Sequence, residues 1–210
     1  MDARFAVLAS GTGTNLQALL DHPLIGPSIA LVVSDKQGTG ALERARSRGV
    51  KSVVLEPGQY RAREDFDRAL TTLLEDEAIE YVLLAGYMRI LGGHTVRAFR
   101  DRILNVHPSL LPAFPGGHAV RDALSSGART TGATVHIVDE EVDHGPVVLQ
   151  EAVLVLPEDD EASLHRRIQE VEHRLFPRAA LLLAEGRLKV EGRRVHVLGD
   201  DEGTSAERPG

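Results

Sequence analysis

The first half of the chain alternates short apolar runs with segments of helical periodicity, and this order constrains the fold more than any other feature. Strand, turn and helix repeated three times predict a parallel sheet with right-handed crossovers. The run at 81–85 is apolar throughout, as expected of a strand that is covered on both faces. The expected strands are 5–9, 29–33, 50–55 and 81–85, and the expected helices are 15–20, 41–48 and 63–78.

The second half begins with one more strand and then changes character. A strand is expected at 102–106, and prolines at 108, 112 and 115 exclude a helix or a central strand directly after it. Any one of these prolines could follow a cis peptide bond. Two strands are expected at 132–138 and 147–156, around the acidic turn 139–146. We therefore predict an α/β fold with a mostly parallel central sheet flanked by helices, and antiparallel strands in the C-terminal half.

The last part of the chain has the pattern of one long helix followed by a hairpin. Apolar side chains recur over 160–184 at spacings of three and four residues, which predicts an amphipathic helix. Residues 187–190 and 194–198 could then form a hairpin around Gly192.

No internal repeat or linker divides the chain, so we expect a single domain at 1–198. Within it we distinguish two lobes, at 1–100 and 101–198, because the order of elements changes near residue 100. The polar residues 199–210 are predicted to form a disordered tail.

The composition argues against several classes of protein. Lys and Arg number 24 against 31 Asp and Glu, and the resulting net charge of −7 argues against binding to nucleic acid or to an anionic membrane. The chain has no cysteine, which excludes disulfides and thiol nucleophiles and fits a cytoplasmic location. No stretch approaches the roughly 18 apolar residues of a membrane-spanning helix.

The first candidate binding site is the turn SGTGTN at residues 10–15, between the first expected strand and helix. Glycines let the backbone approach a ligand closely, and a helix N-terminus offers free amides that suit a phosphate. Leu16 stands where a dinucleotide-binding motif would have its third glycine, and no Gly-Lys-Ser/Thr follows. A plain turn with a threonine cap is the alternative, and we favour a site for a phosphate or a ribonucleotide.

The second candidate site lies at the end of the strand at 102–106. Alternation along a strand places Asn105 and His107 on the same side, and ligands of open parallel sheets bind at the carboxyl ends of strands. An amide donor beside an imidazole can polarise a carbonyl and move a proton. The alternative is that both side chains bind backbone groups of the loop.

Asp143, in the acidic turn, is a third candidate. A carboxylate near His107 would favour the imidazolium and keep a proton available at neutral pH. A solvated acidic turn is the alternative. A metal site of Asp143 with histidines is not favoured, because no pair has the close helical spacing of zinc enzymes; the histidines considered are His107, His118, His136 and His144.

Glu172 follows Gln169 by three residues, and both flank the apolar stripe of the long helix. By residue type alone, they are best interpreted as a polar pair on the surface of that helix.

Taken in order, these segments resemble the phosphoribosylglycinamide formyltransferases, the folate-dependent glycinamide ribonucleotide transformylases. Each segment is modest evidence alone, but their common order makes the resemblance specific. It covers roughly residues 5–188 and implies a Rossmann-like formyltransferase fold. The segments are GTGTNLQA at 11–18, LAGYMRIL at 84–91, NVHPSLLP at 105–112, FPG at 114–116, GATVH at 132–136, DHGP at 143–146 and EH at 172–173.

The resemblance implies an activity and a pair of small-molecule substrates. The formyl group of 10-formyltetrahydrofolate, a co-substrate, would pass directly to the amine of glycinamide ribonucleotide in purine biosynthesis. No metal, nucleic acid or membrane is implied, and the chain would act as a monomer or a homodimer. The lobe at 1–100 would bind the phosphate, and the lobe at 101–198 would carry the folate and catalytic groups.

The resemblance also implies roles for individual residues. Asn105, His107 and Asp143 match the catalytic trio. Arg63 would face the glutamate tail of the folate, and the loop 139–143 would close over its ring. The ribonucleotide would be bound by Gly11, Thr12, Gly13, Thr14, Asn15 and Glu172. The folate would be bound by Arg63, Met88, Arg89, Ile90, Leu91, Asn105, Asp139, Glu140 and Glu141.

One position departs from the pattern. His144 stands where relatives often carry a small residue, and we expect a second titrating group beside the catalytic pair to shift the pH profile. The segment after Leu188 has no role that the resemblance supplies.

Three alternatives stay open. Formyltetrahydrofolate hydrolase and methionyl-tRNA formyltransferase share parts of this core, but we expect an additional N-terminal domain in the first and a C-terminal tRNA-binding domain in the second. A non-catalytic nucleotide-binding module would use the same turn and would not need His107. A nicotinamide-dependent reductase would use Asp35 to bind a ribose, although the missing third glycine disfavours it.

Overall fold

The structure, a computed structural model, describes residues 3–199. The tail expected at 199–210 therefore lies outside the described residues, apart from Gly199.

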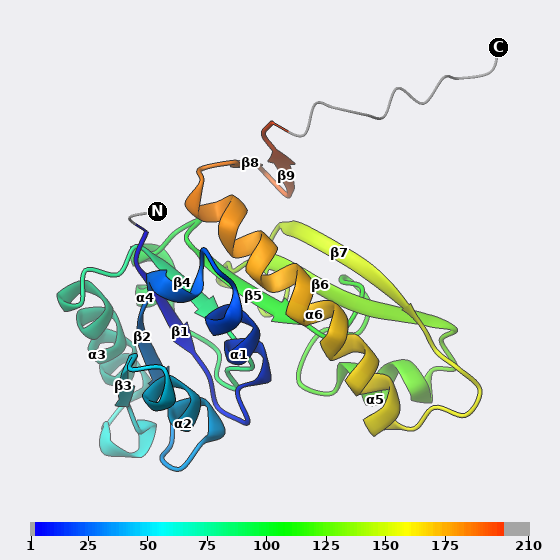
Figure 1. The fold of residues 1–210 in the computed structure, drawn as a ribbon, viewed down its shortest axis with the longest axis horizontal. Coiled ribbons are helices and arrows are strands. Elements are labelled where there is room, and N and C mark those ends of the chain that lie inside the picture. Colours follow the sequence, from blue (N-terminus) through cyan, green and yellow to red (C-terminus); the bar gives the residue numbers. More distant parts are fainter. Residues whose placement is uncertain (1–2, 200–210) are drawn as a thin grey trace.

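A seven-stranded sheet forms the centre of the molecule, with the strand order β3-β2-β1-β4-β5-β6-β7 (Figure 1). Neighbouring strands from β3 to β5 are parallel, and β6 and β7 are antiparallel to their neighbours. The predicted fold class is confirmed. The strands are β1 (Phe5–Leu8), β2 (Ile29–Ser34), β3 (Lys51–Val54), β4 (Tyr81–Leu84), β5 (Ile103–His107), β6 (Thr130–Ile137) and β7 (Val147–Leu154).

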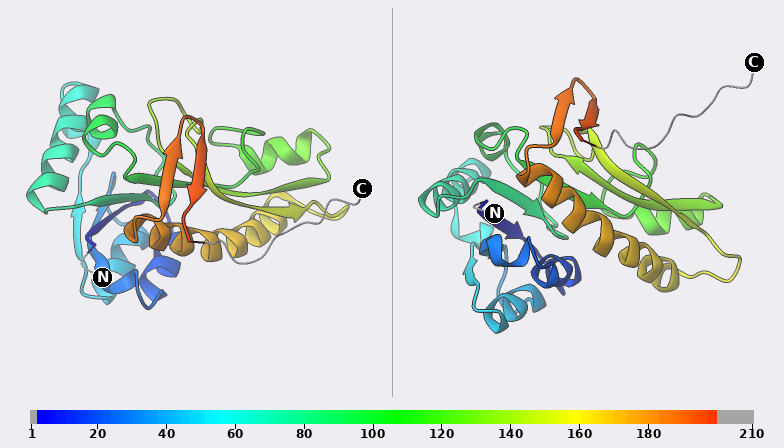
Figure 2. Two further views of the ribbon diagram at one scale, coloured as in Figure 1. Left: turned by 90° about the horizontal axis from the view of Figure 1, so that it is seen from above. Right: turned by 45° about the horizontal axis from the view of Figure 1, so that its top comes forward.

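Helices cover both faces of this sheet, as Figure 2 shows. Successive side chains of β1 point to opposite faces, so Phe5 and Val7 pack against α1 and α6, whereas Ala6 and Leu8 pack against α3. All four are fully buried. The helices are α1 (Thr14–Asp21), α2 (Gly40–Ser47), α3 (Arg63–Asp76), α4 (Gly93–Ala98), α5 (Ala119–Ser125) and α6 (Glu161–Ala184).

The boundaries of the expected helices and strands agree with the structure to within two residues, but two helices were not expected. These are α4 and α5, with 6 and 7 residues. A segment shorter than two turns shows too few apolar positions to establish a helical period. Short turns of 3-10 helix at Gly26–Ser28 and Pro57–Gln59 were not expected either.

Helix α6 is fixed at its start by a reciprocal cap. The side chain of Asp160 accepts a hydrogen bond from the amide of Ser163, and the hydroxyl of Ser163 accepts one from the amide of Asp160. After α6, the strands β8 (Leu188–Glu191) and β9 (Arg194–Val197) form the expected hairpin, and β9 lies against β7.

The loop between β5 and α5 contains the three prolines. The cis peptide bond lies between Leu111 and Pro112, a choice that the sequence left open. The hydroxyl of Thr134, on β6, accepts from the amide of Leu111 at 3.1 Å and donates to the carbonyl of Ser109 at 2.6 Å. These contacts fix the loop to the sheet beside the end of β5.

Candidate active site

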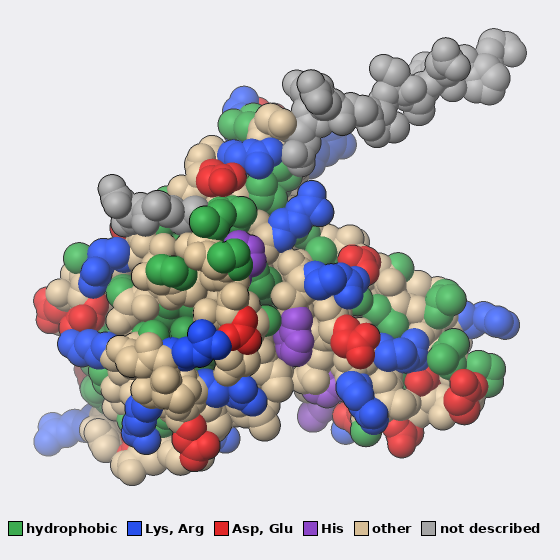
Figure 3. Space-filling model, in the orientation of Figure 1, with side chains coloured by type: hydrophobic (Ala, Val, Ile, Leu, Met, Phe, Trp, Pro, Cys, Tyr) green, Lys and Arg blue, Asp and Glu red, His purple; other side chains and the backbone are tan. Residues whose placement is uncertain are grey.

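A cleft of about 400 Å³ opens at the carboxyl ends of β1, β4 and β5. The strand order reverses around β1, and ligands of open α/β sheets bind at such a switch point. On the face drawn in Figure 3, histidine side chains gather where the surface is indented between its two halves. The cleft is lined by residues 11–15, 84–91, 105–108, 116–117, 136, 138–143, 165, 169 and 172.

The glycine-rich turn forms one end of the cleft, and it packs closely on α2. Gly13 has a φ of +75°, and a Cβ built on it would lie 2.7 Å from Cα of Ala41, so only glycine fits without a shift. A Cβ on Gly40 would lie 2.7 Å from the carbonyl oxygen of Thr12. Arg44 donates to that same carbonyl at 2.9 Å. The turn is therefore held in one shape by α2.

Helix α1 begins directly after Gly13, and no side chain caps its N-terminus. The alternative of a threonine-capped turn is therefore wrong. The first amides of a helix have no partner within it, so this end can donate to an anion in the cleft.

Glu172 lies at the same end of the cleft, and its interpretation as a surface residue is wrong. Its side chain is only 3% exposed and accepts a hydrogen bond from the amide nitrogen of Asn15 at 2.9 Å. Burial raises the pKa of Glu172 to about 7, and the hydrogen bond from Asn15 offsets only part of this effect. Gln169 also lines the cleft, and it is partly buried.

Asn105 and His107 stand on the same side of β5, as alternation predicted. The antiparallel register pairs Asn105 with His136 on β6, and the amide nitrogen of Asn105 lies 3.1 Å from Nε2 of His136. The other ring nitrogen of His136 donates to the carbonyl of Ile137 at 2.9 Å. His136 is 2% exposed and is thus a buried fourth member of the group.

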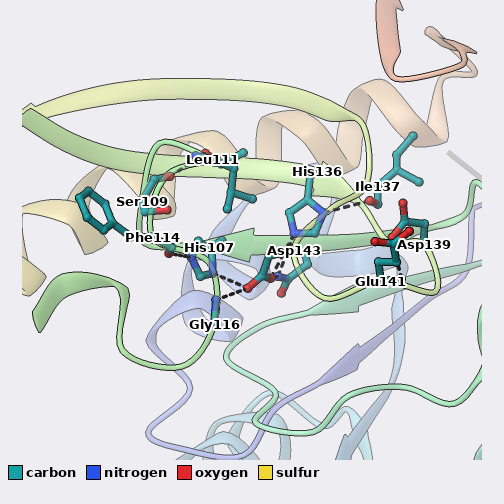
Figure 4. A network of polar contacts seen from close by, with 12 residues as sticks. His107, Ser109, Leu111, Phe114, Gly116, His136, Ile137, Asp139, Glu141 and Asp143 are labelled. Atoms are coloured by element: carbon teal, nitrogen blue, oxygen red, sulfur yellow. Dashed lines mark hydrogen bonds and ion pairs between the residues drawn. The ribbon is translucent and has the colours of Figure 1, made fainter. Parts of the chain in front are cut away.

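Asp143 lies between the two histidines, as Figure 4 shows. Its Oδ2 accepts from the amide of Gly116 at 2.7 Å and lies 3.4 Å from Nδ1 of His107. Its Oδ1 lies 3.4 Å from the amide nitrogen of Asn105 and 3.7 Å from Nε2 of His136. The interpretation as a solvated acidic turn is therefore wrong for this residue.

The ring of His107 is buried, and burial has the largest influence on its charge. Burial lowers the pKa of His107, and the neighbouring His136 adds to this, whereas the carbonyl of Phe114 and the carboxylate of Asp143 act against it. The net pKa lies below the ordinary value. Burial thus acts against the imidazolium that the sequence predicts, whereas both ring nitrogens face acceptors: Nε2 donates to the carbonyl of Phe114 at 2.8 Å, and Nδ1 faces Asp143.

Asp143 has the opposite balance. Burial alone would raise the pKa of Asp143. The contact with His136, the amide of Gly116 and the neighbouring His107 each lower this pKa, and together they outweigh burial, so the net pKa lies below its usual value. The group therefore combines a carboxylate with an imidazole that can exchange a proton.

The segment between β4 and α4 forms the other end of the cleft. Met88 and Ile90 are 73% and 58% exposed, which is unusual for apolar side chains of this size. Arg89 pairs with Asp35 through Nε at 3.0 Å. Asp35 itself does not line the cleft, which disfavours its use in binding the ribose of a nicotinamide cofactor there.

Arg63 is the one predicted site residue that does not line the cleft. Its guanidinium donates to the carbonyls of Ile90 and Leu91 at 3.2 and 3.5 Å, behind the segment that does line it. In this arrangement Arg63 supports the wall of the cleft.

The acidic loop lines the cleft on the same side. Glu140 pairs with Arg97 at 3.0 Å, and Asp139 pairs with Nδ1 of His144 at 2.8 Å. The other ring nitrogen of His144 contacts Arg193 in the terminal hairpin. The expected position of His144 beside the catalytic pair is therefore wrong, because its ring is directed to Asp139 and Arg193.

Sequence reasoning missed two residues of the cleft. His136 was considered only as a metal ligand, because its pairing with Asn105 depends on a register that no local pattern reveals. His165 precedes Glu172 by seven residues, two helical turns, and this spacing could have placed it on the same side of α6.

Within 3–199, no three or more His, Asp and Glu side chains are arranged to hold a metal ion. None of the helices in that range is long and apolar enough to cross a bilayer.

The amino-acid sequence of this chain is similar to those of known proteins. The model of the formyl transferase family matches residues 3–180. The trifunctional purine biosynthetic protein adenosine-3 of Drosophila melanogaster is 45% identical over 188 residues, 87% of this chain but only 14% of the fly protein. The phosphoribosylglycinamide formyltransferase of Escherichia coli K12 is 41% identical over 187 residues, 88% of each chain.

Solved structures give the same result. The crystal structure of glycinamide ribonucleotide transformylase 1 from Symbiobacterium toebii superposes with a TM-score of 0.91 and 50% sequence identity. The match covers 93% of this chain and 94% of that one.

Proposed function

Because this chain belongs to the formyl transferase family, we propose that it transfers the formyl group of 10-formyltetrahydrofolate to the amine of glycinamide ribonucleotide, a step of purine biosynthesis. The catalytic residues in this proposal are Asn105, His107 and Asp143.

One observation carries the proposal: an anion site and a proton-transfer group share a single cleft. The turn at 10–15 and the start of α1 offer amides at one end, and Asn105, His107 and Asp143 lie together further along. A phosphorylated amine fixed at the first end would present its nitrogen to the second. Neither element alone distinguishes a transferase from a binding module.

The chemistry needs no covalent intermediate with the protein. The amine nitrogen attacks the formyl carbon, and the carbonyl electron pair moves to oxygen, giving a tetrahedral species. When that species collapses, the bond between the formyl carbon and N10 of the folate breaks, and the amine proton ends on N10. The amide of Asn105 donates to the developing oxyanion, a type of contact that contributes roughly 2.7–4 kcal/mol.

His107 and Asp143 move the proton. A ring that is neutral at rest accepts the proton that the attacking amine loses and becomes an imidazolium while Asp143 remains a carboxylate. The 3.4 Å contact between these side chains stabilises that cation. The proton then passes to N10, and the pair returns to its starting state.

The two substrates would bind at opposite ends. The phosphate of the ribonucleotide meets the amides after Gly13, and Glu172 accepts from a ribose hydroxyl. The folate ring lies against residues 88–91 and the loop 139–143, where exposed apolar side chains and backbone groups are available. Arg63 acts on the glutamate tail only if its side chain leaves the carbonyls of Ile90 and Leu91.

The test is a transfer assay with both substrates, in which release of tetrahydrofolate is followed by absorbance. We expect release that requires the ribonucleotide amine and falls by at least about a hundredfold in His107→Ala, since general acid–base groups contribute 10²–10⁴-fold. His196→Ala, an exposed histidine on β9, is the matched control and should match the parent.

The other outcomes select the alternatives. Folate release without the amine would mean a hydrolase. Ligand binding with full biological activity in His107→Ala would mean a non-catalytic module, and transfer to an aminoacylated tRNA would mean a different formyl transferase.

We also propose a cytoplasmic location and a monomer or homodimer. The lack of cysteine is consistent with the first, and sedimentation of the purified chain would decide the second.

A further inference from the structure

The wall of the cleft at residues 88–92 is held from behind by side chains that do not line the cleft. Arg63 binds the carbonyls of Ile90 and Leu91, as described above. Asp67 binds the next residues along the chain, where the segment enters α4. The proposed mechanism assigns no role to Asp67.

Asp67 is a buried carboxylate on α3, only 5% exposed. Its Oδ1 accepts from the amide of Gly92 at 3.1 Å, and its Oδ2 accepts from the amides of His94 and Thr95 at 2.9 and 3.3 Å. The hydroxyl of Thr95 also donates to Oδ1. These amides belong to the first turn of α4 and have no partner inside that helix. A side chain of α3 therefore fixes the start of α4.

Gly92 leaves no room for a side chain at this contact. A Cβ built on Gly92 would lie 2.2 Å from Cγ of Asp67, far closer than atoms can approach. The backbone of Gly92 has φ −79° and ψ 159°, which any residue can adopt. The glycine is therefore required by the carboxylate beside it and not by its own conformation.

A second buried residue of α3 secures the same point. The hydroxyls of Thr71 and Thr95 lie 2.9 Å apart, and Thr71 donates to the carbonyl of Asp67 at 3.0 Å. Both threonines are at most 1% exposed. The contact between α3 and the start of α4 is thus a closed polar network in which each member has a partner.

We propose that Asp67 is a positioning residue for the folate co-substrate: it fixes Gly92 and the start of α4, and thereby holds residues 88–91 in the shape that binds the folate. This inference rests on the proposed function. It assigns Asp67 no contact with either substrate and no part in proton transfer.

Asp67→Asn tests the proposal while keeping the shape of the side chain. The new amide presents N–H donors to backbone amides that are themselves donors, and buried donors left unpaired cost enough to weaken an equilibrium about tenfold or more. We expect the KM for 10-formyltetrahydrofolate to rise about tenfold, with little change in the KM for the ribonucleotide. Asp65→Asn is the control, because Asp65 lies on the same helix, its side chain is 41% exposed, and it forms a surface ion pair with Arg68.

Gly92→Ala approaches the same contact from the other side. Its methyl group would displace the carboxylate, so we expect the same selective rise in the KM for the folate. Gly58→Ala is the control, because a Cβ there would meet nothing within 4 Å. In the background of Asp67→Ala, the further change Gly92→Ala should have no additional effect.

Two direct measurements separate this inference from the proposed function. Hydrogen exchange of the amides of Gly92, His94 and Thr95 should accelerate in Asp67→Asn, and the Kd for tetrahydrofolate, measured by calorimetry, should rise. If the parent binds tetrahydrofolate but transfers no formyl group, the proposed function fails and these results still decide the role of Asp67.

The proposal is overturned by any of three results. These are an equal rise in the KM of both substrates in a folded Asp67→Asn protein, an unchanged Kd for tetrahydrofolate in that protein, or a parent protein that binds no tetrahydrofolate.

Discussion

The two ends of the cleft are built in opposite ways. The end that we propose for the ribonucleotide, the ribonucleotide end, is a backbone site, in which the turn at 10–15 rests on α2 through glycine contacts and the buried Glu172 is held by Asn15. The end that we propose for the folate, the folate end, presents exposed apolar side chains, and ion pairs at the surface connect its acidic loop to the rest of the molecule.

This difference matches the ligand that we propose for each end. A phosphate is recognised by fixed amides, so the chain that presents them has to be rigid. A large flat ring system is bound by apolar contact area, so the side chains that supply it must be open to solvent before the ligand arrives. The proposed catalytic trio lies between the ends, and the pKa values of His107 and Asp143 both lie below their ordinary values there.

The largest expected effect is at the position between the two ends. Asn105→Ala removes the proposed donor to the oxyanion, and we expect kcat to fall by about 10²–10³-fold with little change in either KM. Steady-state kinetics with each substrate varied in turn measures this. Gln59→Ala, which removes an exposed amide, is the control. A large rise in one KM with kcat intact would place Asn105 at that end instead.

Replacement of Glu172, at the ribonucleotide end, should increase the stability of the protein at high pH and weaken its binding of the ribonucleotide. Burial raises its pKa from an ordinary 4.5 to about 7, so the folded state binds the proton more tightly than the unfolded state does. Stability from this group is therefore present at low pH and is lost as pH rises from about 4.5 to 7. Glu172→Gln should be more stable than the parent at pH 8, by on the order of 3 kcal/mol at about 1.36 kcal/mol per pKa unit.

Urea denaturation at several pH values measures this difference, with the exposed Glu170→Gln as control. At pH 4 the parent and Glu172→Gln should be alike, and a constant difference at all pH values would contradict the raised pKa. The same variant should bind the ribonucleotide more weakly.

A smaller effect is expected from the turn itself. Gly13→Ala places an L-residue in the left-handed region, which costs roughly 1–2 kcal/mol, and its methyl group presses on Ala41. We expect the KM for the ribonucleotide to rise about tenfold, while the KM for the folate stays the same. Gly58→Ala, where a Cβ meets nothing within 4 Å, is the control. Equal changes in both KM values would show that the two ends are coupled.

The smallest effect is expected at the surface of the folate end. Glu140 and Arg97 are both more than half exposed, and an exposed ion pair contributes about 0–1 kcal/mol. Glu140→Gln should therefore change the free energy of unfolding by less than about 1 kcal/mol, and 0.5 M salt should abolish the difference. A larger change that persists in salt would mean that this loop is part of the rigid framework.

The order of elements could be predicted because it depends on local patterns. Apolar runs and helical periods gave the strands and long helices, and the glycines of residues 11 and 13 indicated the phosphate-type turn. Residue type and position suggested Asn105, His107 and Asp143 as candidates, the resemblance to the family matched them to a trio, and the structure brings these side chains together.

The electrostatics could not be predicted in the same way. Proximity of Asp143 suggested a charged His107, but burial of the ring outweighs that contact. Glu172 was interpreted as a surface residue because charged side chains on helices usually are, yet its side of α6 faces the buried end of α1. Burial depends on what packs against a residue, and no window of sequence contains that information.

The sequence by itself determined the longer helices, the strands and the candidate sites at their ends, because side-chain periodicity and glycine conformations act over a few residues. Only the tertiary structure decided that His136 would face Asn105, that Asp67 would fix the start of α4, and that Arg63 would support the wall of the cleft. These contacts join residues 25 to 31 positions apart in the chain. Their existence depends on strand register and helix packing, which are set by the molecule as a whole.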